Sequence, residues 1–334
     1  MAVAGATGPF NGTLIAFLLA AGLPCGGSDA GLFSWKLASV MAVKKTGSVK
    51  SVAAAGEAKK SGPVRIGFLG PEYSYSHIAA LHQFSSKAEL IPLPTIKAVF
   101  EAQKAGTIHF GVVPLENSTD GRIVDTMGMF VRMPVKVTAE VPLRIHHTLL
   151  SMSPKSSITE IYSKPQAISQ CRDWLAANLP KAKLLEMSST TAAAELASKK
   201  PGVAAIASRE AGEHYGLKVL AANIEDNKDN VTRFAVLGET TPAPTGNDKT
   251  ALMMSIPHQS GALADVMMIF KKFKLNMTWI ESFPMPNKHN QYLFFIEFEG
   301  HADDAAVKKA LTALAKKTVR LDVLGSFAKG KPVG

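Results

Sequence analysis

Five short segments rich in hydroxyl and amide side chains are the part of this sequence that could do chemistry. They are residues 70–76, 114–121, 163–166, 188–191 and 230–234. Such groups donate hydrogen bonds, and a helix that begins beside them favours an anion through its free N–H groups and its dipole. The alternative is that each segment only caps a helix, since caps use the same residue types. Because five segments share this character, we expect a cleft that binds a carboxylate.

Apolar runs and helical patterns alternate around these segments. Strands are expected at 64–69, 88–93, 109–114, 161–162, 183–187, 203–206 and 232–237, with helices between them. This alternation predicts an α/β fold with mainly parallel sheets covered by helices. We predict two lobes, 63–140 plus 230–243 and 141–229. The polar segments follow strands and should therefore meet in the cleft between the lobes.

Composition excludes several classes of protein. The 334 residues are 46% hydrophobic, which rules out global disorder. No run reaches the ~18 apolar residues of a membrane-spanning helix. Two cysteines, Cys25 and Cys171, cannot build a disulfide scaffold or a four-ligand zinc site, and Cys171 is expected in the core. The net charge of +10 comes from scattered Lys and Arg, which is weak evidence for nucleic acid.

No cofactor is implied by the sequence. There is no Gly-rich phosphate loop and no His/Glu pair at zinc spacing. His146 and His147 are adjacent on an extended run, so their side chains point to opposite faces and cannot chelate one ion together. We therefore predict neither a metal site nor a nucleotide site.

Residues 1–62 differ from the rest of the chain and are rich in Gly, Ala and Ser. The apolar run 14–23 resembles the core of a secretory signal, but no Lys or Arg precedes it. We expect a disordered or mis-started leader, with Met41 as a second candidate for the start. Export and organelle targeting are the competing explanations for this segment. The expected location is cytoplasmic, or the plastid if the segment is a transit peptide.

Four of the polar segments resemble motifs of the prephenate dehydratase family, in family order. The first loop is Gly70–Ser76 with Ala79-Ala80, the Glu-Asn-Ser loop is Val112–Gly121, the Pro-Gln-Ala helix start is Lys164–Cys171, and the Thr-Arg-Phe signature is Asn230–Phe234. The similarity runs from about residue 64 to 328. In the first loop, Tyr73 stands where the family usually has Gly, a residue chosen for unusual backbone dihedrals. Lys164 stands where the family often has His.

The resemblance implies conversion of prephenate to phenylpyruvate, with loss of water and carbon dioxide. It makes Thr232 the proton donor to the departing hydroxide, and Phe234 a wall around the ring. Arg233 offers a planar fork that matches a substrate carboxylate, and its alternative role is a structural ion pair at the lobe junction. Glu116 is expected to be structural, since it would repel a dianion. The residues expected to orient the substrate are Ser76, Asn117, Ser118, Thr119 and Gln170.

Residues 249–330 have an order of their own, β-α-β-β-α-β, which is the ferredoxin-like pattern. Residues 261–264 and 281–284 resemble the two motifs of the ACT regulatory domain attached to prephenate dehydratases, in which phenylalanine binds between paired domains. Phe283 departs from that pattern, because the family commonly has Arg there. The effector-binding residues implied are Gly261, Ala262, Leu263, Asn276, Glu281 and Ser282.

The function expected is therefore a prephenate dehydratase with a two-lobed, periplasmic-binding-protein-like catalytic domain and an ACT domain. We expect feedback regulation by phenylalanine, a homodimer or homotetramer, and no cofactor, nucleic-acid partner or membrane. An arogenate dehydratase is the nearest alternative, because it runs the same chemistry on an amino side chain. A non-enzymatic amino-acid sensor is the alternative of another class, since two-lobed binding proteins share the architecture.

Overall fold

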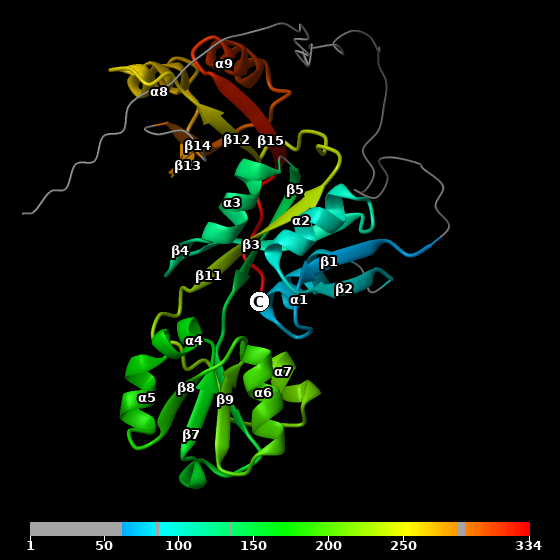
Figure 1. Cartoon of the computed structure of the whole chain (residues 1–334), viewed down its shortest axis with the longest axis vertical. Helices are drawn as coiled ribbons and strands as arrows, with labels where there is room; N and C mark the ends of the chain where they lie inside the picture. Colours follow the sequence, from blue (N-terminus) through cyan, green and yellow to red (C-terminus); the bar gives the residue numbers. More distant parts are fainter. Residues whose placement is uncertain (1–61, 85–86, 134, 286–290) are drawn as a thin grey trace, which may run out of the picture. The chain divides into compact units, whose positions relative to one another are not determined.

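The computed structural model describes residues 62–84, 87–133, 135–285 and 291–334. The expectations for the leader, including Cys25 and Met41, fall on residues outside this description. The described chain forms two lobes followed by a C-terminal domain (Figure 1). The predicted α/β fold class is confirmed.

The first lobe is built on a six-stranded sheet of order β2-β1-β3-β11-β5, with β4 paired to β3. Its elements are β1 (Arg65–Leu69), α1 (Tyr75–Gln83), β2 (Glu89–Leu93), α2 (Ile96–Lys104), β3 (Phe110–Asn117), β4 (Gly121–Arg122), α3 (Val124–Arg132), β5 (Lys136–Arg144) and β11 (Val231–Gly238). Helix α2 shows why this lobe folds: Ile96, Val99, Phe100 and Gln103 recur at helical spacing and are buried.

The second lobe is built on a five-stranded sheet of order β10-β6-β9-β7-β8. Its elements are β6 (Thr148–Ser151), a 3-10 turn (Lys155–Ser157), β7 (Glu160–Ser163), α4 (Pro165–Ser169), α5 (Arg172–Asn178), β8 (Lys183–Glu186), α6 (Thr190–Lys199), β9 (Val203–Ala207), α7 (Arg209–His214) and β10 (Lys218–Ala221). In Figure 1, α4 and α5 cover one face of this sheet, and α6 and α7 cover the other. Every residue of the central strand β9 is buried, as expected between two helical layers.

Two details of the predicted lobes need correction. The first lobe continues through Arg144, because β5 pairs along its length with β11, so the boundary predicted at residue 141 falls inside a strand. The sheets are mixed, not mainly parallel as predicted. Strands β1, β2 and β3 pair in parallel, as do β7, β8 and β9. In contrast, β11 runs antiparallel to both its neighbours, β4 is antiparallel to β3, and β6 is antiparallel to β9 and β10. The chain crosses between the lobes at 145–147 and 222–230, and the two crossings are hydrogen-bonded to each other.

The C-terminal domain has the predicted ferredoxin-like order. Its elements are β12 (Asp248–Ser255), α8 (Ala262–Lys272), β13 (Met277–Pro284), β14 (Tyr292–Glu299), α9 (Ala305–Ala315) and β15 (Arg320–Ala328). They form a four-stranded antiparallel sheet of order β13-β14-β12-β15. One face packs against α8 and α9 through side chains such as Val266, Phe270 and Leu314.

The other face of this sheet shares a hydrophobic core with the first lobe. Phe295 from β14 packs near Phe130 from α3, with ring centroids 6.3 Å apart, and Phe327 from β15 belongs to the same cluster. The segment after β15 then returns to the first lobe, where Val333 makes a parallel bridge with Leu143. The C-terminal domain is thus packed onto the first lobe, and the chain joins the two at both ends of the domain.

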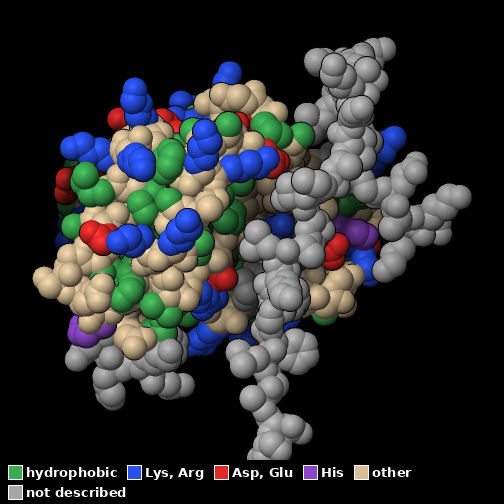
Figure 2. Space-filling model, turned by 90° about the horizontal axis from the view of Figure 1, so that it is seen from above, with side chains coloured by type: hydrophobic (Ala, Val, Ile, Leu, Met, Phe, Trp, Pro, Cys, Tyr) green, Lys and Arg blue, Asp and Glu red, His purple; other side chains and the backbone are tan. Residues whose placement is uncertain are grey.

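Figure 2 views the molecule from the end where α8 and α9 lie. On this face, the Lys and Arg side chains are separated by apolar and other side chains, rather than gathered into one stripe. No helix within the described residues is both long and apolar enough to span a membrane.

Gly325→Ala should destabilise the contact between the C-terminal domain and the first lobe. A β-carbon at Gly325 would lie 2.1 Å from the carbonyl oxygen of Val137, so β15 would have to move away from β5. We expect the free energy of unfolding to fall by about 1–3 kcal/mol, measured by denaturant titration. Gly128→Ala in α3 is the control, since nothing lies within 4 Å of the added carbon. Equal stability of the two variants would contradict this packing.

Candidate functional site

A cavity of about 710 Å³ lies in the cleft, and residues of both lobes line it. Three helices begin at its edge, with Ser74 before α1, Thr95 before α2 and Ser189 before α6. Each of these side chains accepts a hydrogen bond from the backbone N–H three residues further on. They are therefore helix caps that also border the cleft, and two of them, Ser74 and Ser189, belong to the predicted polar segments.

Thr232 lines the cavity and is only 9% exposed. Its hydroxyl oxygen accepts a hydrogen bond of 2.8 Å from Asn117 Nδ2. No other hydrogen bond of this hydroxyl occurs in the part of the chain that the structure describes, so its own hydrogen is available to a ligand. A hydrogen bond donated to the oxygen stabilises the negative charge that remains after a proton leaves. The arrangement makes Thr232 a better proton donor than an ordinary threonine.

Asn117 is fixed in the orientation that this role requires. Its Oδ1 accepts hydrogen bonds from the backbone N–H groups of Thr119 and Asp120, at 2.9 and 3.0 Å. The amide nitrogen is therefore left to donate to Thr232 and to Asn230 Oδ1. Because the loop 117–120 itself determines the rotamer, the donor is in place before any ligand binds.

Gln170 connects the two lobes across the cavity. Its Nε2 donates to Asp120 Oδ2 at 3.0 Å, and its Oε1 accepts from Asn230 Nδ2 at 3.0 Å. Asp120 and Asn230 both neighbour the first-lobe strands that carry Asn117 and Thr232. The sequence predicted Asn117 and Gln170 for the site, and their connection through Asn230 is a finding of the structure.

His147 belongs to this cavity, although the sequence pattern pointed only to its inability to chelate a metal with His146. Its Nε2 lies 2.9 Å from Gln170 Oε1, and its Nδ1 lies 2.9 Å from the hydroxyl of Tyr75. Burial lowers the pKa of His147, so the ring is neutral. Nε2 then carries the proton and donates to Gln170 Oε1. The Tyr75 hydroxyl, which has a single hydrogen, donates it to the carbonyl oxygen of His146 at 2.8 Å and lies beside Nδ1. His147 lies in the crossing 145–147 between the lobes, a position that the lobe boundary predicted at 141 did not indicate.

Ser76, Ser118 and Thr119, predicted to orient the substrate, and Phe234, predicted as a wall around the ring, divide into two groups. Ser76 and Phe234 line the cavity, and both are buried. Ser118 and Thr119 are not among the lining residues: the Ser118 hydroxyl accepts from Val231 N and donates to Asp229 O. These contacts hold the loop 117–120 against the start of β11, which is a structural task.

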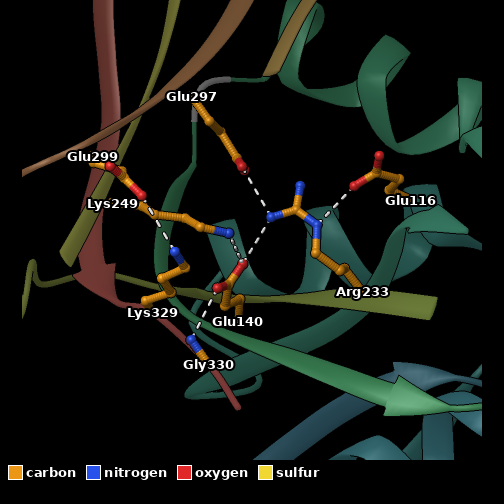
Figure 3. A network of polar contacts seen from close by, with 8 residues as sticks. All are labelled: Glu116, Glu140, Arg233, Lys249, Glu297, Glu299, Lys329 and Gly330. Carbon is orange, nitrogen blue, oxygen red and sulfur yellow. Dashed lines mark hydrogen bonds and ion pairs between the residues drawn. The ribbon is translucent and has the colours of Figure 1, made fainter. Parts of the chain in front are cut away.

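The placement predicted for Arg233 is wrong. Successive residues of a strand point to opposite faces, so Thr232 and Phe234 face the cavity and Arg233 does not. Its guanidinium is 14% exposed and is held by the carboxylates of Glu116, Glu140 and Glu297 (Figure 3). Arg233 therefore has the alternative role, a structural ion pair. The ion pair was expected between the two lobes, but it joins the first lobe to the C-terminal domain. Glu116 is structural, as predicted.

Two other cations border the cavity and were not predicted as site residues. Lys164 precedes α4, and Arg122 lies in β4, where it also pairs with Glu281 of β13 at 2.5 Å. The guanidinium of Arg122 lies 5.5 Å from the centroid of Phe283, the residue that departs from the family pattern. The cavity therefore has positive charge on both lobes without Arg233.

Tyr73 makes a contact between the lobes that depends on an unusual backbone. It keeps the left-handed conformation usual for glycine, with φ at +60°. Its ring stacks on His214 of the second lobe at a centroid distance of 4.0 Å, and its carbonyl accepts a hydrogen bond from Ser208. Tyr73 thus adopts a backbone conformation that favours glycine, and its ring adds an aromatic contact between the lobes.

A smaller cavity of about 340 Å³ lies at the start of α8. Gly261, Ala262 and Leu263 line it, as predicted for an effector site, together with residues of β14 that include Tyr292. Of the other predicted effector residues, none is among those lining it. Asn276 donates to Glu299, Glu281 pairs with Arg122, and Ser282 lies on β13, at the edge of the sheet.

No group of three or more His, Cys, Asp or Glu side chains that could hold a metal ion occurs among the described residues. Cys171 directly precedes α5 and is buried in the core of the second lobe, and burial raises the pKa of its thiol.

The cleft and the ferredoxin-like domain define a class: a two-lobed α/β unit with a cavity between its lobes, followed by a small α+β domain. The family profile described as prephenate dehydratase (PDT) matches residues 66–242. A bifunctional chorismate mutase/prephenate dehydratase of Aquifex aeolicus is 39% identical over 267 residues, which cover 80% of this chain and 74% of the relative. The chain belongs to the prephenate dehydratase family.

Solved structures agree with this assignment. Prephenate dehydratase from Arthrobacter aurescens, in complex with L-Phe, matches with a TM-score of 0.74 and 32% identity over 80% of this chain and 90% of that one. GqqA, described as a novel type of quorum quenching acylase, matches with a TM-score of 0.73 and 26% identity over 79% of this chain and 98% of that one.

His147→Gln should reduce the acid sensitivity of folding. A buried neutral histidine has a lowered pKa, so below its ordinary value near 6.5 only the unfolded chain takes up the proton, and stability falls as pH falls. A pKa difference of one between the folded and unfolded chain corresponds to about 1.4 kcal/mol. We expect the unfolding free energy of the variant to fall less between pH 7.5 and 5.5 than that of the parent. His82→Gln, on the exposed side of α1, is the control. If the free energy of unfolding of His147→Gln fell as steeply with pH as that of the parent, the ring would take up a proton in the folded state too.

Proposed function

We propose that the chain is a lyase that converts prephenate to phenylpyruvate, water and carbon dioxide. The observation that carries the proposal is the hydroxyl of Thr232, which lies in the cavity and accepts a hydrogen bond from Asn117. Membership of the prephenate dehydratase family supports the same reaction.

The reaction needs a proton at one place. The bond from the ring carbon to its carboxylate breaks, and the electron pair enters the ring as carbon dioxide leaves. The carbon–oxygen bond on the opposite side of the ring breaks, and the departing oxygen takes the proton of Thr232 to leave as water. Asn117 Nδ2 stabilises the oxygen of Thr232 until solvent returns the proton. The buried Phe234 lies beside Thr232 and excludes water from the forming aromatic ring.

The substrate carries two carboxylates, and Arg233 is unavailable to them. Lys164, Arg122 and the start of α6 border the cavity and supply positive charge. Asp120 and Asp125 also border it and would repel a carboxylate.

Three other outcomes remain distinguishable by one assay. An arogenate dehydratase would run the same steps on an amino side chain, and Asp120 or Asp125 could pair with that ammonium group. An amino-acid sensor would bind without turnover. Amide hydrolysis, the activity named for GqqA, would release a carboxylic acid and an amine. Incubation of the purified protein with prephenate, arogenate and an N-acylated amine, with the products followed for each, separates them.

We propose further that phenylalanine is an effector that binds the C-terminal domain as an ACT domain, with the catalytic domain at 63–243 and the ACT domain at 249–330. The L-Phe complex of the Arthrobacter aurescens enzyme supports this. The smaller cavity offers Gly261 and the start of α8 to a ligand carboxylate. Strand β13 is an edge strand, so a second copy in a homodimer or homotetramer would bring Glu281 and Ser282 to the site.

Thr232→Val should reduce kcat on prephenate by about 10²–10⁴-fold with little change in KM, because it removes the proton donor and keeps the shape. Thr232→Ser is the matched control, since it keeps a hydroxyl that Asn117 can contact. Steady-state kinetics on both variants decide the question. An unchanged kcat in Thr232→Val would show that Thr232 is not the proton donor.

Gly261→Ala should weaken phenylalanine binding, measured by calorimetry on the full chain. Gly261 has φ at +81° and open space around it, so the added methyl group costs backbone strain and enters the cavity. Gly106→Ala is the matched control, with φ at +68° and open space but no effector cavity. We expect about tenfold weaker binding in Gly261→Ala alone, which is about 1.4 kcal/mol. The same binding in both variants would place the effector elsewhere.

A further inference from the structure

The guanidinium of Arg233 connects three strands that meet where the first lobe and the C-terminal domain pack together (Figure 3). Its Nε donates to Glu116 of β3 at 2.8 Å. Its Nη1 donates to Glu140 of β5 at 2.8 Å and to Glu297 of β14 at 2.9 Å. The guanidinium also lies 5.1 Å from the ring centroid of Trp279 in β13. Two of these four partners, Glu297 and Trp279, belong to the C-terminal domain.

Glu140 ties the same cluster to two further parts of that domain. Its Oε2 also accepts from Lys249 Nζ of β12 at 3.0 Å, and its Oε1 accepts from the backbone N–H of Gly330 at 2.9 Å. Figure 3 shows these contacts converging on one carboxylate. Nε and Nη1 of Arg233 are therefore held by protein carboxylates, and Arg233 is not among the residues that line the cavity.

The charge balance of the cluster does not require Glu297. Two cations, Arg233 and Lys249, face three carboxylates, which gives 2 − 3 = −1. Burial raises the pKa of Glu297, and its Oε1 has no hydrogen-bond partner among the described residues. A buried carboxylate with an unpaired oxygen costs stability. Stability therefore does not explain why Glu297 occupies this position.

The catalytic side chain is adjacent to this cluster in the chain. Thr232 and Arg233 are consecutive in β11, and the pairing of β11 with β3 shifts register directly after Arg233. Such an irregularity lets a strand bend locally, so the position of Arg233 influences the position of the Thr232 hydroxyl. A displacement of about 1 Å at a reacting group can cost about 10²-fold in rate.

We propose that Arg233 is a positioning residue that ties the strand carrying Thr232 to the C-terminal domain, with Glu297 as the contact through which that domain acts on the site. This rests on the proposed function, since it assumes that Thr232 donates the proton. Arg233 thus responds to the regulatory domain and does not bind the substrate.

Glu297→Leu tests this, because it removes the contact from the C-terminal domain and leaves two cations facing two carboxylates, which favours folding. We expect kcat on prephenate to fall by about tenfold with KM within about twofold, and inhibition by phenylalanine to weaken. Hydrogen exchange of the amides of 231–238 should be about tenfold faster. Glu297→Gln should recover most of the parental values, since its amide oxygen can accept from Arg233. Lys308→Gln, which removes an exposed ion pair with Asp303 on the same domain, is the control.

The outcomes are separable. Absence of turnover in the parent would defeat the proposed function, and the exchange of 231–238 would then decide the positioning role alone. Arg233→Lys should lower kcat in the parent but have little further effect in the Glu297→Leu background. A raised KM with parental kcat in Arg233→Lys, together with parental behaviour of Glu297→Leu, would make Arg233 a substrate ligand and overturn the proposal. Equal exchange of 231–238 in Glu297→Leu and Lys308→Gln would overturn it as well.

Discussion

The alternation of side chains along strand β11 is the constraint on which the rest of the structure depends. One face of this strand carries Thr232 and Phe234 into the cleft, and the other carries Arg233 to the C-terminal domain. A single interior strand of the first lobe's sheet therefore contributes to two regions at once. Because the backbone is shared, neither region can move far without moving the other. The antiparallel direction of β11 brings its first residues to the cleft, where the carboxyl end of β3 also lies.

The lobes and the C-terminal domain were predictable because local patterns define them. Strand–helix alternation and helix caps such as Ser74 and Ser189 depend on near neighbours in the sequence. The reversed direction of β11 was not predictable, because the partners that pair with it are distant in the chain. The boundary placed at 141 failed for the same reason, since β5 is extended by its pairing with β11 up to Arg144.

The misplacement of Arg233 was avoidable in part. Adjacent strand residues face opposite ways, and this holds for Thr232 and Arg233 as it does for His146 and His147 on their extended run. That rule alone removes Arg233 from the cleft. What no local rule could supply is the destination of its side chain, because Glu140 and Glu297 lie 93 and 64 residues away in the sequence. The hydrogen-bonded path from Asn117 through Asn230 to Gln170 is long-range in the same sense.

The return of the chain after β15 has a mechanical consequence. The polypeptide passes between the first lobe and the C-terminal domain twice, once before β12 and once where Val333 pairs beside β5. A body tethered at two points cannot swing freely, and its easiest rigid motion is a rotation about the line that joins them. The amplitude of such a motion is small close to this line and grows with distance from it. Such a rotation would twist strands beside the tethers, such as β5, and would strain the contacts that join the distant edge strand β13 to the first lobe, Glu281 with Arg122 and Trp279 with Arg233.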